Sequence, residues 1–403
     1  MDSKQQGSQG EGVKPLVSFV VPCFKLAGLL PECLRSILSQ SYENFEILIM
    51  DDCSPDNTFE VARSFTDPRV RHIRNEPNLG HLANYNKGIG LSRGSYVWLI
   101  SADDRLRSSE VLARYVEVME KHPDVGYACC PAVELKGGQE TGVAKYSVLA
   151  KQDTIFNGRK FITQHLNASN CVVAASGMVR KSCYETHGAF PLDLPYAGDW
   201  YLWSLLALHY RVAYFAEPMV NYRLHELSMT TALMENDPRV CARDDLAVLW
   251  RLARKAQKLG ADDVANSFRR SLALEYVRLL TGRRHRVSSK LGFSDFEEIL
   301  QQDATDKSEA AWIYSRVCTA LADFHFVERD YTRASEFYRL ALEKDPLLVS
   351  ARLKLIFLHM GVPGAALRNA VFGLRRWLTL SRERLRYRRI GHFGRIENGE
   401  KTL

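Results

Sequence analysis

The first hundred residues alternate short apolar runs with segments of helical periodicity. The apolar runs predict four strands, at Val17–Val21, Phe45–Met50, Val70–Arg74 and Tyr96–Ile100. The segments between them predict helices at Leu29–Leu38, Thr58–Phe65 and Ala83–Leu91. Strands that alternate with helical crossovers predict a parallel, doubly wound α/β sheet.

Polar side chains follow each of these strands at the point where the strand ends. They are Pro22–Phe24, Asp51–Asp52, Asn75–Asn78 and Asp103–Asp104. Ligands of open α/β sheets bind beyond the carboxyl ends of the strands, so we expect these groups to form one site. His81 and Asn84, just after the third strand, are candidate nucleotide contacts at the same edge.

The first turn contains none of the glycine-rich motifs that cradle phosphates. Pro22-Cys23-Phe24 stands where a dinucleotide-binding fold has glycines, and the chain contains no G-x-x-x-x-G-K-[ST]. Adjacent carboxylates instead suit Mg²⁺ or Mn²⁺, which prefer oxygen ligands and leave positions open for substrate phosphates. A phosphate bound here is therefore expected to arrive with a divalent cation.

Beyond residue 120 the pattern predicts two further strands and one long helix. The strands are expected at Val125–Cys130 and Cys171–Val179, and an amphipathic helix at Ala197–Tyr210. Asp199 stands at the start of this helix. On the residues alone, its simplest interpretation is a helix N-cap.

Four short motifs follow one another in the first half of the chain. They are Pro22-x-Phe24, FEILIMDDCSPDNT at Phe45–Thr58, the run Asn78–Ile89 and ISADD at Ile100–Asp104. Together they resemble glycosyltransferase family 2, whose members are inverting, metal-dependent enzymes with a GT-A fold. The resemblance covers about residues 15–230, and Lys25 stands where the family often has Asn.

This resemblance implies a role for each residue of the motifs. Pro22 and Phe24 would line the nucleotide base, Asp52 would hydrogen-bond it, and Asn78 would lie in the same nucleotide site. Asp103 would meet the ribose. Asp104 would ligate the metal that bridges the diphosphate.

Two motifs of the second half extend the resemblance. Gly198-Asp199-Trp200 resembles the family's acidic motif, which implies that Asp199 is the base that takes the proton of the acceptor hydroxyl. VNYRLHELSMTT at Val220–Thr231 resembles the family's YRxHxxSxT segment. It implies a metal or diphosphate contact by His225, with a purely structural histidine as the alternative. Arg223 and Ser228 are further candidates at the leaving group.

Residues 240–365 carry long helical periodicities and no strand pattern. Helices are expected at Leu246–Leu259, Val264–Leu280, Ala310–Phe326, Thr332–Glu343 and Leu348–Met360. The spacing of a tetratricopeptide repeat (TPR) is matched by Cys318, Leu321, Ala322, His325, Ala334, Tyr338, Ala341 and Pro346. We expect a TPR-like helical domain that supports the catalytic domain, mediates homo-oligomerisation or binds a protein partner.

The net charge of +7 is carried by the end of the chain. Nine Arg and one Lys against three Glu between Ala366 and Leu403 account for all of it, which leaves residues 1–365 electroneutral. One apolar stripe runs beside these arginines, formed by Leu367, Val371, Leu374 and Leu378. Such a basic amphipathic helix is expected either to pack on the helical domain or to bind an anionic membrane surface. No sequence feature supports nucleic-acid binding.

Four parts are expected along the chain: a disordered lead at 1–13, a GT-A domain at 14–238, a helical domain at 239–365 and the basic segment at 366–403. The nine cysteines form no C-x-x-C pair, which predicts free thiols in a reducing compartment. No apolar run is long enough to span a bilayer. We therefore expect a cytoplasmic protein, peripheral on the membrane if the basic segment binds lipid.

The expected function is transfer of a sugar from a UDP-, dTDP- or GDP-sugar to a hydroxyl of a glycan or lipid-linked glycan, with Mn²⁺ or Mg²⁺, in polysaccharide or glycolipid biosynthesis. Two alternatives stay open. A sugar-nucleotide nucleotidyltransferase would need a glycine-rich, basic first turn, and Pro22–Leu26 is neither. A non-catalytic binding protein on the same scaffold would be expected to have lost Asp103, Asp104 or Asp199, and all three are present.

Overall fold

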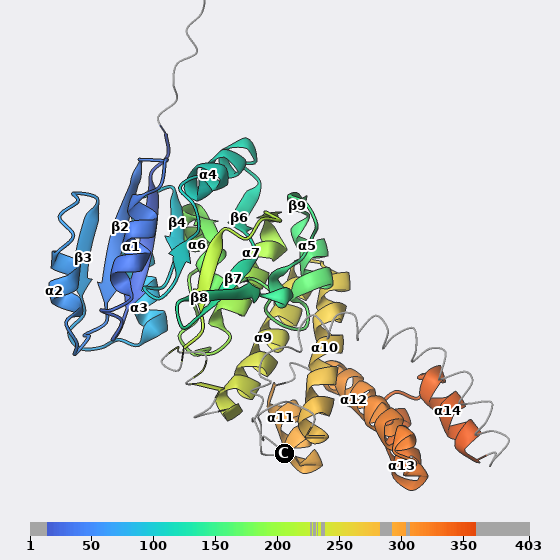
Figure 1. Cartoon of the computed structure of the whole chain (residues 1–403). Helices are drawn as coiled ribbons and strands as arrows, with labels where there is room; N and C mark the ends of the chain where they lie inside the picture. Colours follow the sequence, from blue (N-terminus) through green and yellow to red (C-terminus); the bar gives the residue numbers. More distant parts are fainter. Residues whose placement is uncertain are drawn as a thin grey trace, which may run out of the picture.

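The computed structural model describes residues 14–225, 228, 231, 233–234, 238–282, 292–303 and 307–359. Its first part is built on an eight-stranded sheet, and its second part consists of helices (Figure 1). In spatial order the strands are β3 (Val70–Arg74), β2 (Phe45–Asp51), β1 (Val17–Cys23), β4 (Tyr96–Leu99), β10 (Met178–Arg180), β6 (Val125–Cys129), β11 (Arg211–Tyr214) and β9 (Thr154–Phe156).

The four strands predicted from the first hundred residues are parallel neighbours in this sheet. β1 lies between β2 and β4, so that Val20 is opposite both Leu48 and Leu99. The connecting helices are α1 (Leu30–Leu38), α2 (Thr58–Arg63) and α3 (His81–Leu91). Gly88 lets α3 approach β1 closely, because a Cβ atom there would lie 2.4 Å from Cγ1 of Val20. This half of the sheet is doubly wound, as predicted.

The other half of the sheet mixes strand directions. β10 is antiparallel to both β4 and β6, whereas β11 is parallel to β6 and β9 is antiparallel to β11. A second sheet has the order β5 (Arg105–Leu106), β12 (Val220–Arg223), β7 (Ala132–Lys136) and β8 (Gln139–Val143). Because β12 pairs with β5, the segment that carries His225 lies beside Asp103 and Asp104, which directly precede β5.

Hydrophobic residues cover both faces of the large sheet. Val17, Phe19 and Val21 of β1 belong to one core cluster, and Val20 belongs to a second cluster on the opposite face. The second cluster continues through α7 (Gly198–His209) into α9 (Pro238–Lys258) and α10 (Asp262–Leu280). The helical part therefore shares its core with the sheet.

Two predictions for the middle of the chain are wrong. Within Cys171–Val179 only Met178 and Val179 belong to a strand, and residues 174–176 form a 3-10 turn. The apolar residues of this segment are divided between the two cores: Cys171, Val172 and Val179 belong to the cluster that includes α7, and Val173, Ala175 and Met178 belong to the cluster on the opposite face of the sheet. α7 itself is buried on all sides from Leu202 to Leu208, so it is a core helix and not an amphipathic one.

Further helices complete the described structure. They are α4 (Val111–Lys121), α5 (Gly158–Phe161), α6 (Lys181–His187), α11 (Phe293–Asp303), α12 (Lys307–Val327), α13 (Tyr331–Lys344) and α14 (Val349–His359). The helices expected between residues 246 and 360 are present, and α11 was not predicted. In α12 and α13 the repeat positions Cys318, Leu321, Ala322, Ala334, Tyr338 and Ala341 are buried. That burial is compatible with a TPR-like hairpin, and the assignment to this repeat stays a prediction.

Some expectations fall outside the residues that the structure describes. These are the lead at 1–13 and the basic segment at 366–403, with its proposed packing or membrane contact. The domain limits at 238 and 365 likewise stay predictions. All nine cysteines are free, as expected. Among the described helices, none has both the length and the apolar content required of a membrane span.

Candidate active site

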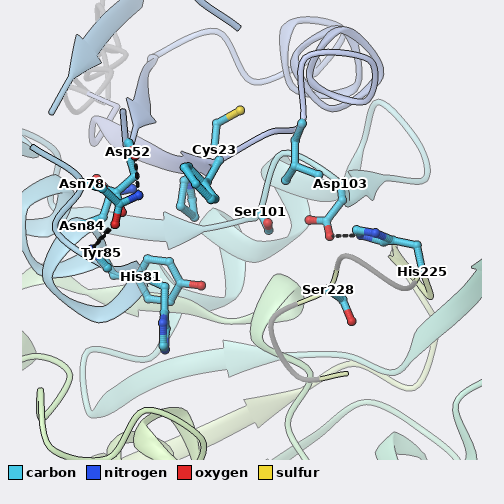
Figure 2. A pocket seen from close by; sticks show the side chains of 14 residues that line it. Cys23, Asp52, Asn78, His81, Asn84, Tyr85, Ser101, Asp103, His225 and Ser228 are labelled. Carbon is cyan, nitrogen blue, oxygen red and sulfur yellow. Dashed lines mark hydrogen bonds and ion pairs between the residues drawn. The ribbon is translucent and has the colours of Figure 1, made fainter. Parts of the chain in front are cut away.

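A pocket of about 320 Å³ lies where β1, β2 and β4 end at the carboxyl edge of the sheet. It is lined by Pro22, Cys23, Phe24, Leu26, Asp52, Asn78, Gly80, His81, Asn84, Tyr85, Ser101, Asp103, His225 and Ser228. Asp52 and Asn78 lie at one side, Asp103 and His225 lie at the other, and Ser101 lies between them (Figure 2). Nine of the twelve candidate residues named from the sequence thus line one pocket, and Asp104, Asp199 and Arg223 are not among the lining residues.

Asp52 is fixed by the loop that follows β3. Its Oδ1 accepts hydrogen bonds from the Leu79 amide at 2.8 Å and the Asn75 side chain at 2.9 Å, and its Oδ2 accepts one from the Gly80 amide at 3.0 Å. Nδ2 of Asn78 donates to the Asp52 carbonyl at 2.6 Å. A carboxylate accepts about four hydrogen bonds, so one position of Asp52 stays open toward the pocket.

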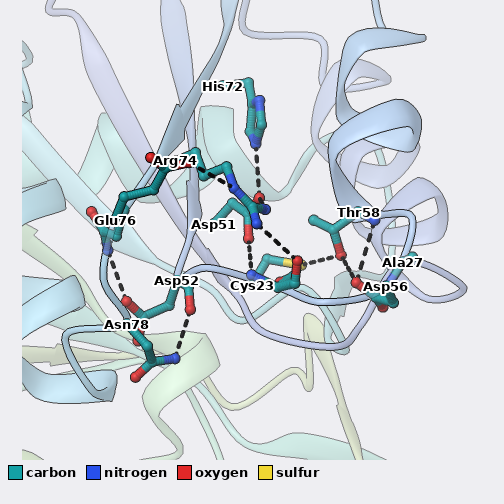
Figure 3. A network of polar contacts seen from close by, with 12 residues as sticks. Cys23, Ala27, Asp51, Asp52, Asp56, Thr58, His72, Arg74, Glu76 and Asn78 are labelled. Carbon is teal, nitrogen blue, oxygen red and sulfur yellow. Dashed lines mark hydrogen bonds and ion pairs between the residues drawn. The ribbon is translucent and has the colours of Figure 1, made fainter.

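The neighbouring Asp51 has a structural role behind the pocket. It is fully buried, and it accepts hydrogen bonds from the Ser54 amide at 2.8 Å, Arg74 at 2.7 Å and His72 at 3.3 Å (Figure 3). Burial would raise the pKa of Asp51, but these hydrogen bonds lower it below its ordinary value. Asp51 therefore anchors the end of β2, and only Asp52 faces the pocket.

Asp103 and His225 form the polar pair at the other side of the pocket. His225 Nε2 lies 2.7 Å from Asp103 Oδ2, while Asp103 Oδ1 is buried without a hydrogen-bond partner among the described residues. A buried carboxylate oxygen without a partner, beside an imidazole nitrogen, fits a divalent cation that takes its other ligands from water and phosphate. In the part of the chain that is described, no cluster of three or more His, Cys, Asp or Glu side chains could hold a metal.

Asp104 is not among the residues that line the pocket. It is buried, and its Oδ1 accepts a hydrogen bond from the Arg223 amide at 2.9 Å. Burial, with the charge of Asp103 as a second cause, raises the pKa of Asp104 well above its ordinary value. Arg223 also donates to the Asp103 carbonyl at 2.8 Å and pairs with Glu32 at 2.6 Å. Asp104 and Arg223 together hold the turn at Asp103 against β12, which leads into His225.

Asp199 is the second residue of α7 and is half-buried. Its Oδ2 accepts a hydrogen bond from Asn170 Nδ2 at 2.7 Å, and its Oδ1 accepts one from the Trp200 amide at 2.7 Å. The N-cap position belongs to Ala197, so Asp199 does not cap the helix. Burial raises the pKa of Asp199 to about 6, against the opposing effect of its hydrogen bonds. Such a carboxylate is ionised at neutral pH and is basic enough to take a proton.

Tyr85 is a further residue of the pocket. Burial raises the pKa of this tyrosine, and the charges of Asp103, Asp199 and Asp104 raise it further. Tyr85 and Ser101 line the pocket but were not predicted. For Tyr85 a sequence signal existed, since His81, Asn84 and Tyr85 have the i, i+3, i+4 spacing of one helical face.

Lys25 has a left-handed backbone conformation, with φ of 59°. Asn tolerates this conformation better than most residues, which gives a physical reason for an Asn at this position in relatives. Here the Lys25 ammonium lies 5.0 Å from the centroid of the Phe24 ring. Phe24 is 43% exposed and stands at the mouth of the pocket.

Comparisons with known proteins point to one family. The family model for glycosyl transferase family 2 matches residues 18–186. An uncharacterized glycosyltransferase of Haemophilus influenzae is 30% identical over 216 residues, which cover 52% of this chain and 66% of that protein. GlyG of Streptococcus pneumoniae is 37% identical over 112 residues, covering 27% of this chain and 37% of GlyG.

A third relative is a putative teichuronic acid biosynthesis glycosyltransferase, TuaG of Bacillus subtilis, which is 29% identical over 110 residues, or 27% of this chain and 44% of TuaG. The chain thus spans less than two thirds of the length of these curated relatives. Among solved structures, S. aureus TarS 1–349 in complex with UDP-GlcNAc superposes with a TM-score of 0.52 at 17% identity, over 85% of this chain and 88% of that one. Residues 18–186 therefore match glycosyltransferase family 2, and the fold is of the predicted GT-A type.

Proposed function

We propose that this protein is an inverting, metal-dependent glycosyltransferase that moves a sugar from a nucleotide-sugar donor to an acceptor hydroxyl. One observation carries the proposal. A single pocket holds a fixed carboxylate, Asp52, at one side and the Asp103–His225 pair at the other, in a domain of glycosyltransferase family 2. Such a pocket offers separate contacts to the base and to the diphosphate of one nucleotide sugar.

In the proposed complex the nucleotide base lies between Pro22, Phe24 and Asn78 and donates a hydrogen bond to the open position of Asp52. Asp103 and His225 are the residues that hold the divalent cation. When bound, the cation neutralises charge on the diphosphate of the donor and of the leaving nucleoside diphosphate. This role was expected of Asp104, and the burial of Asp104 outside the pocket favours Asp103 instead.

Asp199 is the proposed general base. Ionised above about pH 6, it accepts the proton of the acceptor hydroxyl while that oxygen bonds to the anomeric carbon. The bond between this carbon and the diphosphate oxygen breaks on the opposite face, so the configuration inverts. The hydrogen bonds from Asn170 and Trp200 orient the carboxylate.

The proposed acceptor is a glycan or a lipid-linked glycan in polysaccharide biosynthesis. Support comes from a relative, TuaG, which is a putative teichuronic acid biosynthesis glycosyltransferase. A lipid-linked acceptor would also suit the membrane contact predicted for the basic segment at 366–403. The proposed donor classes are UDP-, dTDP- and GDP-sugars.

The direct test is a screen of the purified protein against these donors with Mn²⁺ and Mg²⁺, followed by thermal shift and by donor hydrolysis. We expect at least one donor to raise the melting temperature only with metal and to be hydrolysed slowly. Binding without turnover of any donor, with or without added glycans, would favour the non-catalytic scaffold. Absence of both binding and turnover would contradict the proposed function.

A further inference from the structure

Helix α9 carries a buried carboxylate, Asp244, that contacts the chain just before Asp199. Asp244 is fully buried, and its Oδ2 accepts hydrogen bonds from the amides of Tyr196 at 2.7 Å and Ala197 at 3.4 Å. Its Oδ1 lies 3.5 Å from the exposed guanidinium of Arg243. Ala197 is the N-cap of α7, and Asp199 is two residues further on.

Burying a carboxylate so that it accepts hydrogen bonds from two backbone amides costs desolvation free energy. Burial raises the pKa of Asp244, so the ionised side chain is held against a desolvation cost. The amides at the start of a helix have no partners within the helix and carry partial positive charge, which makes a carboxylate a strong acceptor for them. Asp244 therefore fixes the position at which α7 begins.

The same segment is held from its other side by the helix that lines the pocket. His81 Nε2 of α3 lies 2.9 Å from the Pro195 carbonyl, and Gly198 packs on Leu82. The start of α7 thus lies between α3 and α9. If the contacts to α9 were lost, only α3 would hold the start of α7. Asp199 would then be free to shift relative to the pocket.

We infer that Asp244 is a positioning residue for the proposed base, so that the helical part of the chain contributes to the active site. This inference rests on the proposed function of Asp199. It predicts that removing the Asp244 acceptor displaces Asp199 and leaves Asp52, Asp103 and His225 in place, because these three residues come from other elements. A displacement of about 1 Å at a reacting group lowers turnover by about 100-fold.

The test compares Asp244→Ala with Asp244→Asn in the full-length protein. Asn keeps an oxygen that can accept both amide hydrogen bonds, whereas Ala removes it. Arg251→Ala is the matched control, because Arg251 is also on α9 and pairs with Asp193 of the same segment, but at the surface, where an ion pair contributes little. Three quantities are measured: hydrogen–deuterium exchange of peptides covering residues 190–203, the dissociation constant of the donor, and kcat for donor hydrolysis.

We expect Asp244→Ala to speed exchange in these peptides and to lower kcat by at least about tenfold, with an unchanged dissociation constant of the donor. Asp244→Asn and Arg251→Ala should resemble the wild type in all three. If Asp244→Ala does not yield folded protein, Asp244→Ser takes its place under the same expectations. Unchanged exchange, an equal loss in donor affinity, or an Asp244→Asn variant as impaired as Asp244→Ala would overturn the inference. A wild-type protein that turns over no donor would contradict the proposed function instead, while exchange would still decide whether Asp244 holds the start of α7.

Discussion

The two sides of the candidate site are built differently. On the donor side, Asp52 and Asp103 each follow a strand of the parallel half-sheet, and β1, β2 and β4 bring them to one edge. On the base side, Asp199 is held by Asn170, 29 residues earlier, and its helix is held by Asp244, 45 residues later. The first arrangement follows from one regular motif, and the second needs three segments to pack correctly.

This difference has a mechanical consequence. A sheet edge is stiff because neighbouring strands share hydrogen bonds along their length, so the two carboxylates of the donor side depend little on the rest of the chain. The base depends on a loop and a helix start whose contacts come from segments far apart in the chain. Substitutions on the donor side should therefore change donor or metal binding, and substitutions on the base side should change turnover.

The largest effect is expected for Asp199→Asn. Asn cannot accept the acceptor proton, so kcat should fall by about 1,000-fold, within the range known for loss of a general base. The donor dissociation constant should not change, which a titration of the inactive variant measures. The control is Asp193→Asn, a substitution of an exposed carboxylate six residues earlier. Normal turnover by Asp199→Asn would remove Asp199 as the base.

The next effect separates the two aspartates after β4. Asp103→Asn should weaken Mn²⁺-dependent donor binding by about 100-fold or more, since even partners of a metal ligand contribute 10- to 100-fold to affinity. Asp104→Asn should leave this binding unchanged, because Asp104 is not among the residues that line the pocket and Asn keeps an oxygen that can accept the hydrogen bond from the Arg223 amide. Calorimetric titration of donor with and without Mn²⁺ measures both. Weakened binding by Asp104→Asn together with unchanged binding by Asp103→Asn would instead support Asp104 as the metal ligand, as the sequence led us to expect.

The smallest effect concerns pH. Because burial raises the pKa of Asp199 to about 6, the base is protonated below that pH, and kcat should fall tenfold per pH unit on the acid side. Asn170→Ala removes a hydrogen bond to the ionised carboxylate of Asp199, so the pKa of Asp199 should rise. The acidic side of the pH–kcat profile should then move to higher pH by about one pH unit. A pH–rate profile of both proteins measures this shift. Identical acid limbs in the two profiles would show that Asn170 does not tune the base.

Much of the donor side could be predicted before the structure was known. The apolar runs at 17–21, 45–50 and 96–100 are strands within one or two residues, because strands buried on both faces leave a continuous hydrophobic pattern. The segment at 70–74 is also a strand, although it lies at the edge of the sheet and is only partly buried. The polar residues after them then had to meet at one edge. Which of two adjacent carboxylates faces the pocket was not predictable, because β5 and β12 decide it through the bond from the Arg223 amide to Asp104.

The base side was predicted less well, for a related reason. The apolar run at 171–179 has the composition of a strand, but its side chains are divided between the two core clusters and only Met178 and Val179 belong to a strand. α7 has polar residues at its start and aromatic residues along its length, and burial on all sides became visible only when α9 covered it. The contacts of Asp199 with Asn170, and of Tyr196 with Asp244, join positions whose separation follows no short-range pattern.

By itself the sequence determined the α/β order of the first part, the helical nature of the second, the family resemblance and the residues from which a site would be built. These depend on local periodicity and on short motifs, which one chain displays directly. Tertiary structure alone decided that Asp103 rather than Asp104 lies beside His225. It also decided that burial raises the pKa of Asp199, which does not cap its helix, and that α9 contacts the start of α7. Burial and distance set these properties, and both arise only when segments far apart in the chain pack together.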